Sequence, residues 1–128
     1  MTRDFRKIKA WQNSKKFALV IYKFTKSLPR EETYGLTSQI RRAAVSVPTN
    51  IAEGASRQHK RDYLNFLYTA KASLSEVECL ISICKDLEYL DKKNIEYLEN
   101  LYLESARTLF GLIRSVENEV RGIFSSKL

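Results

Sequence analysis

The sequence predicts an all-α fold, an up-down-up-down antiparallel four-helix bundle formed by one domain over residues 1–128. Apolar residues recur at steps of three and four along most of the chain, which is the spacing of a helix face. Only four Gly and two Pro interrupt it, too few turn residues for an all-β fold of this length. The apolar segments are joined by short connections, which favour antiparallel neighbours.

The first helix is expected over about 9–28, where Phe17, Ile21 and Phe24 share one face and Pro29 ends the segment. Residues 1–8 are expected to be a loose end. The second helix is expected over about 36–56, with Ile40, Val47 and Ile51 on its main apolar face.

Pro48 conflicts with this second helix, because proline in a helix interior costs about 3 kcal/mol. The apolar face nevertheless continues across it from Ile40 to Ile51. We therefore expect one helix kinked at Pro48, with packing overriding propensity. The alternative is two short helices, with Thr49 as a new N-cap.

The third helix is expected over about 60–87 and the fourth over about 93–123, with a loose tail after Phe124. The third alternates steps of four and three, and the fourth keeps the same repeat of about 3.5 residues, which is the spacing of a bundle seam. The seam of the third consists of Tyr63, Leu67, Ala70, Leu74, Val77, Ile81 and Cys84. That of the fourth consists of Ile95, Leu98, Tyr102, Ser105, Leu109, Leu112, Val116, Val120 and Ile123.

Nothing in the sequence indicates an enzyme, a metal site or a cofactor. His59 is the only histidine, and its place before the third helix suits a surface or capping role. Cys79 and Cys84 stand five apart and face different directions, so neither a disulfide nor a metal site is expected. No apolar stretch reaches membrane-spanning length, and the N-terminus lacks the apolar core of a signal peptide. We expect a protein of the reducing cytoplasm.

The formal net charge is +7, and it is unevenly distributed. The first thirty residues hold nine Lys or Arg and one acidic residue, whereas residues 62–91 hold two and six. Lys9, Lys16, Lys23 and Arg30 recur every seven residues on one side of the first helix, and Lys26 adds to them. A row of cations without acidic neighbours can follow a phosphate backbone, so these five are the candidate nucleic-acid contacts. The alternative is that they only keep the protein soluble.

A second row, Arg107, Arg114 and Arg121, has the same spacing on the fourth helix. Glu104 and Glu117 stand within helical reach of it, and local ion pairs therefore explain much of this row. In the second helix, Glu53 and Arg57 form a favourable i,i+4 pair.

The second and third helices carry more apolar surface than one buried stripe requires. Val45, Pro48 and Ala52 form a small-residue face on the second, bordered by Arg41. Tyr68 and Ala72 belong to a row on the third that also holds Leu64, Cys79 and Ile83. Contiguous apolar surface on a small protein marks an interface, so we expect a homo-oligomer. The alternative is a compact bundle that buries more than one stripe per helix.

The segment from Leu36 to Arg57, LTSQIRRAAVSVPTNIAEGASR, closely resembles the signature of bacterial four-helix-bundle proteins named for intervening sequences in 23S ribosomal RNA genes. The aromatic-basic segment from Phe5 to Trp11 and the run RDYLNFLYTAKASLSEVECLI are similar too. The resemblance implies a bundle that assembles into a ring-like homo-oligomer, a pentamer. It also implies similarity to the accessory proteins of diversity-generating retroelements, which are basic bundles that bind nucleic acid and a reverse transcriptase.

Two functions follow as hypotheses. One is a nucleic-acid-binding oligomer, for RNA or DNA, that uses the cations of the first helix. The other is a structural or adaptor oligomer whose partner is a protein and whose basic surface is incidental.

Overall fold

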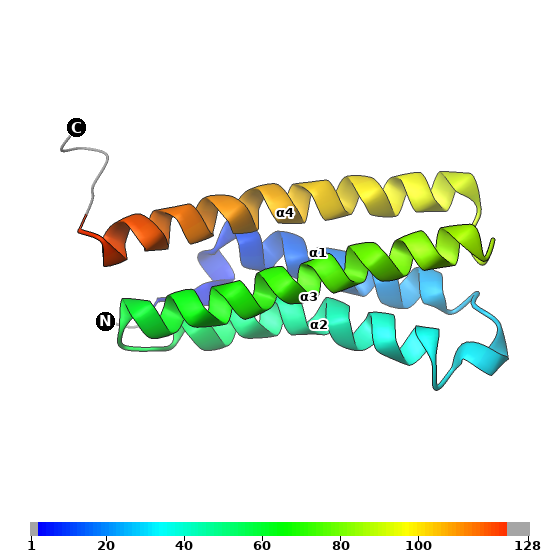
Figure 1. The fold of residues 1–128 in the computed structure, drawn as a ribbon, viewed down its shortest axis with the longest axis horizontal. Coiled ribbons are helices and arrows are strands. Elements are labelled where there is room, and N and C mark those ends of the chain that lie inside the picture. Colours follow the sequence, from blue (N-terminus) through cyan, green and yellow to red (C-terminus); the bar gives the residue numbers. More distant parts are fainter. Residues whose placement is uncertain (1–2, 123–128) are drawn as a thin grey trace.

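The computed structural model describes residues 3–122 and contains four long helices joined by short connections (Figure 1). They are α1 (Lys9–Thr25), α2 (Leu36–Ala55), α3 (Lys60–Asp86) and α4 (Lys92–Val120), and two short 3-10 helices, η1 (Phe5–Lys7) and η2 (Arg30–Glu32), precede α1 and α2. α1 begins and α4 ends at the same end of the bundle, so successive helices run in opposite directions (Figure 1). The predicted all-α four-helix bundle is confirmed.

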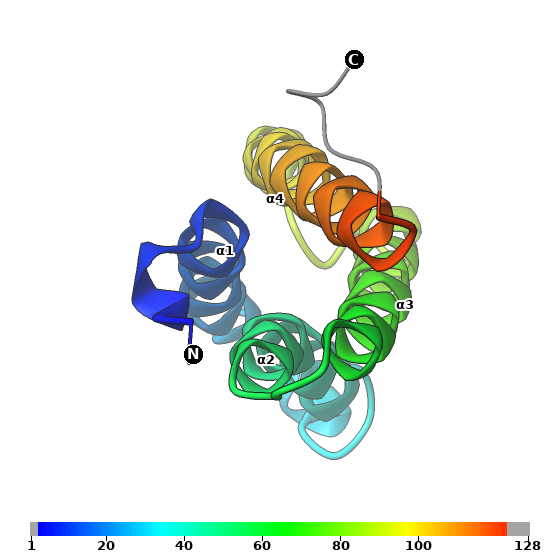
Figure 2. The ribbon, with the colours of Figure 1, turned by 90° about the vertical axis from the view of Figure 1, so that its left-hand side faces the viewer.

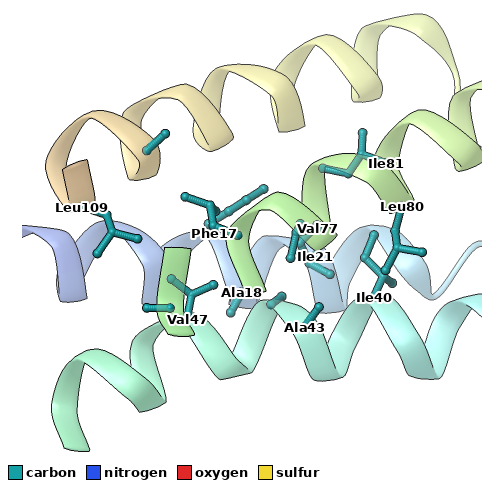
Figure 3. Packing of buried hydrophobic residues seen from close by; sticks show 14 of the residues in the cluster. Phe17, Ala18, Ile21, Ile40, Ala43, Val47, Val77, Leu80, Ile81 and Leu109 are labelled. Atoms are coloured by element: carbon teal, nitrogen blue, oxygen red, sulfur yellow. The ribbon is translucent and has the colours of Figure 1, made fainter. Parts of the chain in front are cut away.

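The helices follow one another in chain order around a common core, and α1 also packs against α4 (Figure 2). Phe17 and Ile21 of α1 meet Ile40 and Val47 of α2 in this core, with Val77 of α3 close by (Figure 3). Every residue of the predicted α3 seam is buried. The apolar periodicity therefore identified the inward face correctly, because burying that face is what holds such helices together.

Pro48 lies inside α2, which continues unbroken on both sides of it. The alternative of two short helices is therefore wrong. Thr49 does not act as an N-cap, because its hydroxyl donates to the carbonyl of Val45, 2.8 Å away, within the helix. Ala44 and Val47 are both buried, and their packing offsets the hydrogen bond that proline removes. The kink itself stays a prediction.

α1 ends three residues earlier than expected, at Thr25 rather than Leu28. The amides of Ser27 and Leu28 bond to the carbonyls of Phe24 and Thr25, which are the tighter turns of a fraying helix end. Leu28 is still buried, so it packs in the core although it lies past the end of the helix. Arg30 consequently leaves the register of α1 and stands in η2, beside Glu31.

The expectation that residues 1–8 form a loose end is wrong for residues 3–8, which pack against the bundle. The Phe5 and Trp11 rings meet edge to face, with their centroids 4.9 Å apart. The Arg3 guanidinium lies 4.4 Å from the centre of the Tyr63 ring and donates to the carbonyl of Arg57, 3.2 Å away. This segment thus satisfies a carbonyl just past the end of α2, a contact between residues 54 positions apart.

At the opposite end, α3 closes with Glu88 at a φ of 59° and the Tyr89 amide bonded to the carbonyl of Cys84. This is a Schellman ending, with glutamate at the position that glycine usually occupies. The carboxylate of Glu32 accepts from the Leu36 amide and from the Tyr89 hydroxyl, at 3.2 and 2.9 Å. One side chain thereby links the start of α2 to the connection before α4.

Candidate nucleic-acid interface

The outer face of α1 is a surface of lysines around one leucine. Ala10, Phe17 and Ile21 point into the core, and the helical repeat therefore turns Lys15, Lys16, Leu19, Lys23 and Lys26 outward. All five are exposed, and Leu19 keeps 61% of its surface open. We call these five residues the lysine face.

A shallow hollow of about 490 Å³ lies on this surface. It is lined by Trp11, Gln12, Lys15, Lys16, Leu19, Val20 and Lys23, all of them from α1. The Nζ atom of Lys15 lies 5.0 Å from the centre of the Trp11 ring, a cation–π distance. The hollow therefore combines ammonium groups with an apolar centre, and no carboxylate lines it.

The lysine face has no internal counter-charge in the part of the chain that the structure describes. Between residues 3 and 122 the ion pairs are Arg6–Asp4, Arg57–Glu53 and Arg107–Glu104, and none of them involves α1. Two of the three were expected from helical spacing, namely those of Arg57 and Arg107. A cation without a partner is free to bind an anionic ligand without first losing an internal contact.

The predicted cations do not form one uniform row. Lys16 and Lys23 line the hollow, and Lys26 is exposed just past the end of α1. Lys9 is exposed at the start of α1, but the carboxylate of Glu104 from α4 lies near it. The bond from Arg107 and its charge, and then the charge of Lys9, hold the pKa of Glu104 below its usual value. Lys9 therefore shares an acidic neighbour that the local sequence did not reveal.

Lys15, Trp11 and Leu19 belong to the site although sequence analysis did not select them. The signal that could have found them is their spacing, since Trp11, Lys15 and Leu19 follow one another at i,i+4 and so share one helix face. Trp11 and Leu19 are apolar and Lys15 stands outside the seven-residue repeat of cations, so that repeat includes none of the three.

Negative charge gathers elsewhere, in a hollow of about 640 Å³ between α3 and α4. Glu78, Glu96 and Glu99 line it together with Leu103, which is 61% exposed. The molecule thus carries separate basic and acidic surfaces.

The predicted interface residues divide into three groups. Val45 and Tyr68 are about two-fifths exposed, at 40% and 42%, Ala72 is exposed and Ala52 is half-buried. Pro48 is buried inside the subunit, so its assignment to an oligomer interface is wrong. α2 packs against both α1 and α3, so more than one side of this helix is covered within the subunit.

Arg41 is turned toward α1 instead of away from the subunit. Its Nε donates to the hydroxyl of Thr25 at 2.8 Å, one Nη donates to the carbonyl of Tyr22 at 3.2 Å, and its guanidinium lies over the Tyr22 ring. Arg41 therefore satisfies the C-terminal end of α1, where carbonyls lack helical partners. Its predicted interface role stays a prediction beside this internal one.

The histidine and the two cysteines occupy different environments. His59 is exposed at the N-cap of α3, and its side chain makes no capping bond. Cys79 is exposed and Cys84 is buried, which confirms that they face different directions. Burial raises the pKa of the Cys84 thiol. Residues 3–122 hold no group of three or more potential metal ligands.

No helix among these residues combines the length and the apolarity that crossing a membrane requires.

The model of the family of 23S rRNA-intervening sequence proteins matches residues 6–111, from η1 into α4. The chain belongs to this family. The match covers the whole of the lysine face and the α2 segment whose motif first indicated the family.

A solved structure supports the fold of this 23S rRNA-intervening sequence protein. A crystal structure of a protein of unknown function from the S23 ribosomal protein family of Bacteroides thetaiotaomicron superposes with a TM-score of 0.72 at 26% identity. The similarity covers 81% of this chain and 97% of the other. None of the curated proteins matches the chain.

Proposed function

We propose that this protein is a non-enzymatic, basic homo-oligomeric bundle that binds RNA or DNA through the outer face of α1, in the cytoplasm. The observation that carries the proposal is the lysine face, with four exposed lysines that make no ion pair within residues 3–122. Phosphate contacts of this kind give affinity without sequence specificity. Lys9 and Arg30 contribute less, because glutamates stand near both.

The test is the affinity for a labelled oligonucleotide, measured by anisotropy at several salt concentrations. We expect binding to weaken steeply with salt and the double change Lys16→Glu with Lys23→Glu to remove most of it. Where binding remains measurable, loss of two phosphate contacts makes the slope of log affinity against log salt shallower by about 1 to 2.

The matched control is Lys92→Glu with Lys93→Glu. It changes the net charge equally, on exposed residues at the start of α4, and should leave most of the affinity intact. Binding that is indifferent to salt and to the α1 pair overturns the proposal. Equal losses in both double variants also overturn it, because they indicate a response to net charge alone.

The second candidate is an adaptor oligomer that binds a protein. It is favoured by the apolar row on α3, where Tyr68 and Ile83 stay 42% and 41% exposed. This candidate predicts a stable oligomer without nucleic-acid affinity, and a discrete protein that co-purifies with it. The ultraviolet absorbance ratio of the purified protein before and after a high-salt wash distinguishes the two, because only bound nucleic acid raises it.

A further inference from the structure

The hollow on α1 contains apolar side chains, which phosphate binding does not require. Lysines alone suffice for a phosphate backbone. Here they surround Leu19, which keeps 61% of its surface exposed, with Val20 and Trp11 beside it in the same hollow. Apolar surface left open among cations gains free energy when an apolar group covers it. The ligand that suits the hollow therefore offers an apolar face as well as negative charge.

A double helix offers α1 little apolar surface. The bases of a duplex are stacked, and their edges are reached only through the grooves. The major groove of DNA is about 12 Å wide and offers a side chain only the thymine methyl groups as apolar contacts. In duplex RNA this groove is narrower still. A duplex would thus contact the lysines with its backbone and leave Leu19 uncovered.

A single strand can satisfy both parts of the surface. Its bases are free to turn out of the stack, and every base has an apolar face. Lys16 and Lys23 stand seven residues apart on α1, which is about 10 Å along the helix axis, on one side of Leu19. A flexible strand can place phosphates near both and a base over the leucine between them.

We propose that the hollow on α1 receives an unpaired base, and that the ligand of the lysine face is single-stranded nucleic acid. Leu19 and Val20 contact the base, while Lys16 and Lys23 contact the flanking phosphates. Lys15, held near the Trp11 ring, covers the third side. This inference rests on the proposed function and narrows its ligand.

The chain contains a built-in reporter for this site. Trp11 is the only tryptophan, it lines the hollow, and the Phe5 ring packs against it at a centroid distance of 4.9 Å. A base that enters the hollow comes near the indole and quenches its fluorescence. Contacts confined to phosphates elsewhere on the surface leave the emission unchanged.

The experiment compares a strand of about 12 nucleotides with its duplex, at one salt concentration, using the whole protein. We expect the single strand to bind about tenfold more tightly than the duplex and to quench Trp11, which the duplex does not. Leu19→Ser should weaken single-strand binding about tenfold and leave duplex binding unchanged. The matched control is Leu103→Ser, because Leu103 is equally exposed at 61% but lines the acidic hollow between α3 and α4.

Several results separate this inference from the proposed function. Equal affinity for strand and duplex, with no quenching and no effect of Leu19→Ser, overturns the inference and leaves salt-sensitive binding through the lysines standing. Absence of any binding overturns both. A fall in the solution mass of Leu19→Ser, measured by light scattering, also overturns the inference, because the leucine would then lie between subunits.

Discussion

Four tyrosine side chains have a pKa above the usual value for a phenol. Burial raises the pKa of Tyr63 and of Tyr102. Hydrogen bonds to carboxylates raise the pKa of two others, Tyr68 beside Glu117 and Tyr89 beside Glu32. In each case the folded state favours the protonated phenol more than the unfolded chain does.

This predicts a loss of stability in alkali. A pKa above the unfolded value of about 10 means that the stabilisation is complete below pH 10 and is lost as the pH rises through the folded pKa. The buried Cys84 thiol acts in the same direction from about pH 9. We expect the melting temperature to fall above pH 9 and more steeply above pH 10. Thermal unfolding followed by circular dichroism between pH 7 and 11 measures this.

Tyr63→Phe provides the comparison. It keeps the buried ring and removes the ionisable hydroxyl, so its melting temperature should fall less between pH 9 and 11 than that of the unchanged protein. Parallel curves for the two proteins would contradict the role given to Tyr63.

The ion pairs within single helices could be predicted from the sequence. The Glu53–Arg57 and Glu104–Arg107 pairs follow from helical spacing, since the partners lie within one turn. The partners of Arg3 and Arg41 did not follow from it, because those contacts join residues that are far apart in the chain.

At the scale of helices, Gly54 marks a close approach of α2 to α3. A Cβ atom built on Gly54 would lie 2.8 Å from the Cβ of Phe66 and 3.0 Å from the Tyr63 ring, both in α3. Gly111 of α4 is also inside a helix, but a Cβ there has no neighbour within 4 Å. Close packing thus requires glycine at position 54, whereas the space around position 111 leaves room for a side chain.

We therefore predict opposite signs for two alanine substitutions. Gly54→Ala should lower the free energy of unfolding by about 1–3 kcal/mol, because overpacking against α3 outweighs the better helix propensity of alanine. Gly111→Ala should raise it by about 0.5–1 kcal/mol, because propensity acts there alone. Urea unfolding of both variants measures the two changes. A stabilised Gly54→Ala would show that α2 and α3 can separate at little cost.

The helices themselves were largely predictable. Their boundaries lie within three residues of expectation, because the apolar periodicity mostly follows the helix that buries it, although Leu28 continues it past the end of α1. The predicted last seam residue, Ile123, and the predicted tail after Phe124 lie outside the described residues. The segment of residues 3–8 was not, since its order depends on contacts with Tyr63 and Trp11 and not on its own propensity.

At the scale of the whole molecule, the outer face of α3 is an apolar surface that the described residues leave open to solvent. Tyr68, Ala72, Cys79 and Ile83 are all exposed there. Of the predicted interface residues, Tyr68 and Ala72 lie on this face, whereas Arg41 and Pro48 act within the subunit. The proposed homo-oligomer is therefore best tested on α3.

Ala72→Arg places a long cation in the middle of this face. We expect light scattering to show a fall from a multiple of the subunit mass to 14.9 kDa, with the helical circular dichroism unchanged. Ser115→Arg, on an exposed position of α4, is the control and should keep the original mass. An unchanged mass for Ala72→Arg, or a monomeric starting protein, contradicts the assignment.

The sequence by itself determined the helical bundle, its inward faces and the excess of positive charge on the first helix. Each of these depends on periodicity or on local composition, and both are properties of the order of residues. Only the tertiary structure decided which cations stay unpaired, because charges interact through space. It brings Glu104 near Lys9, gathers the acids of α3 and α4 in one hollow and leaves Lys15, Lys16, Lys23 and Lys26 around an open leucine. The candidate nucleic-acid contacts are thereby reduced from a row of cations along the first helix to the lysines around Leu19.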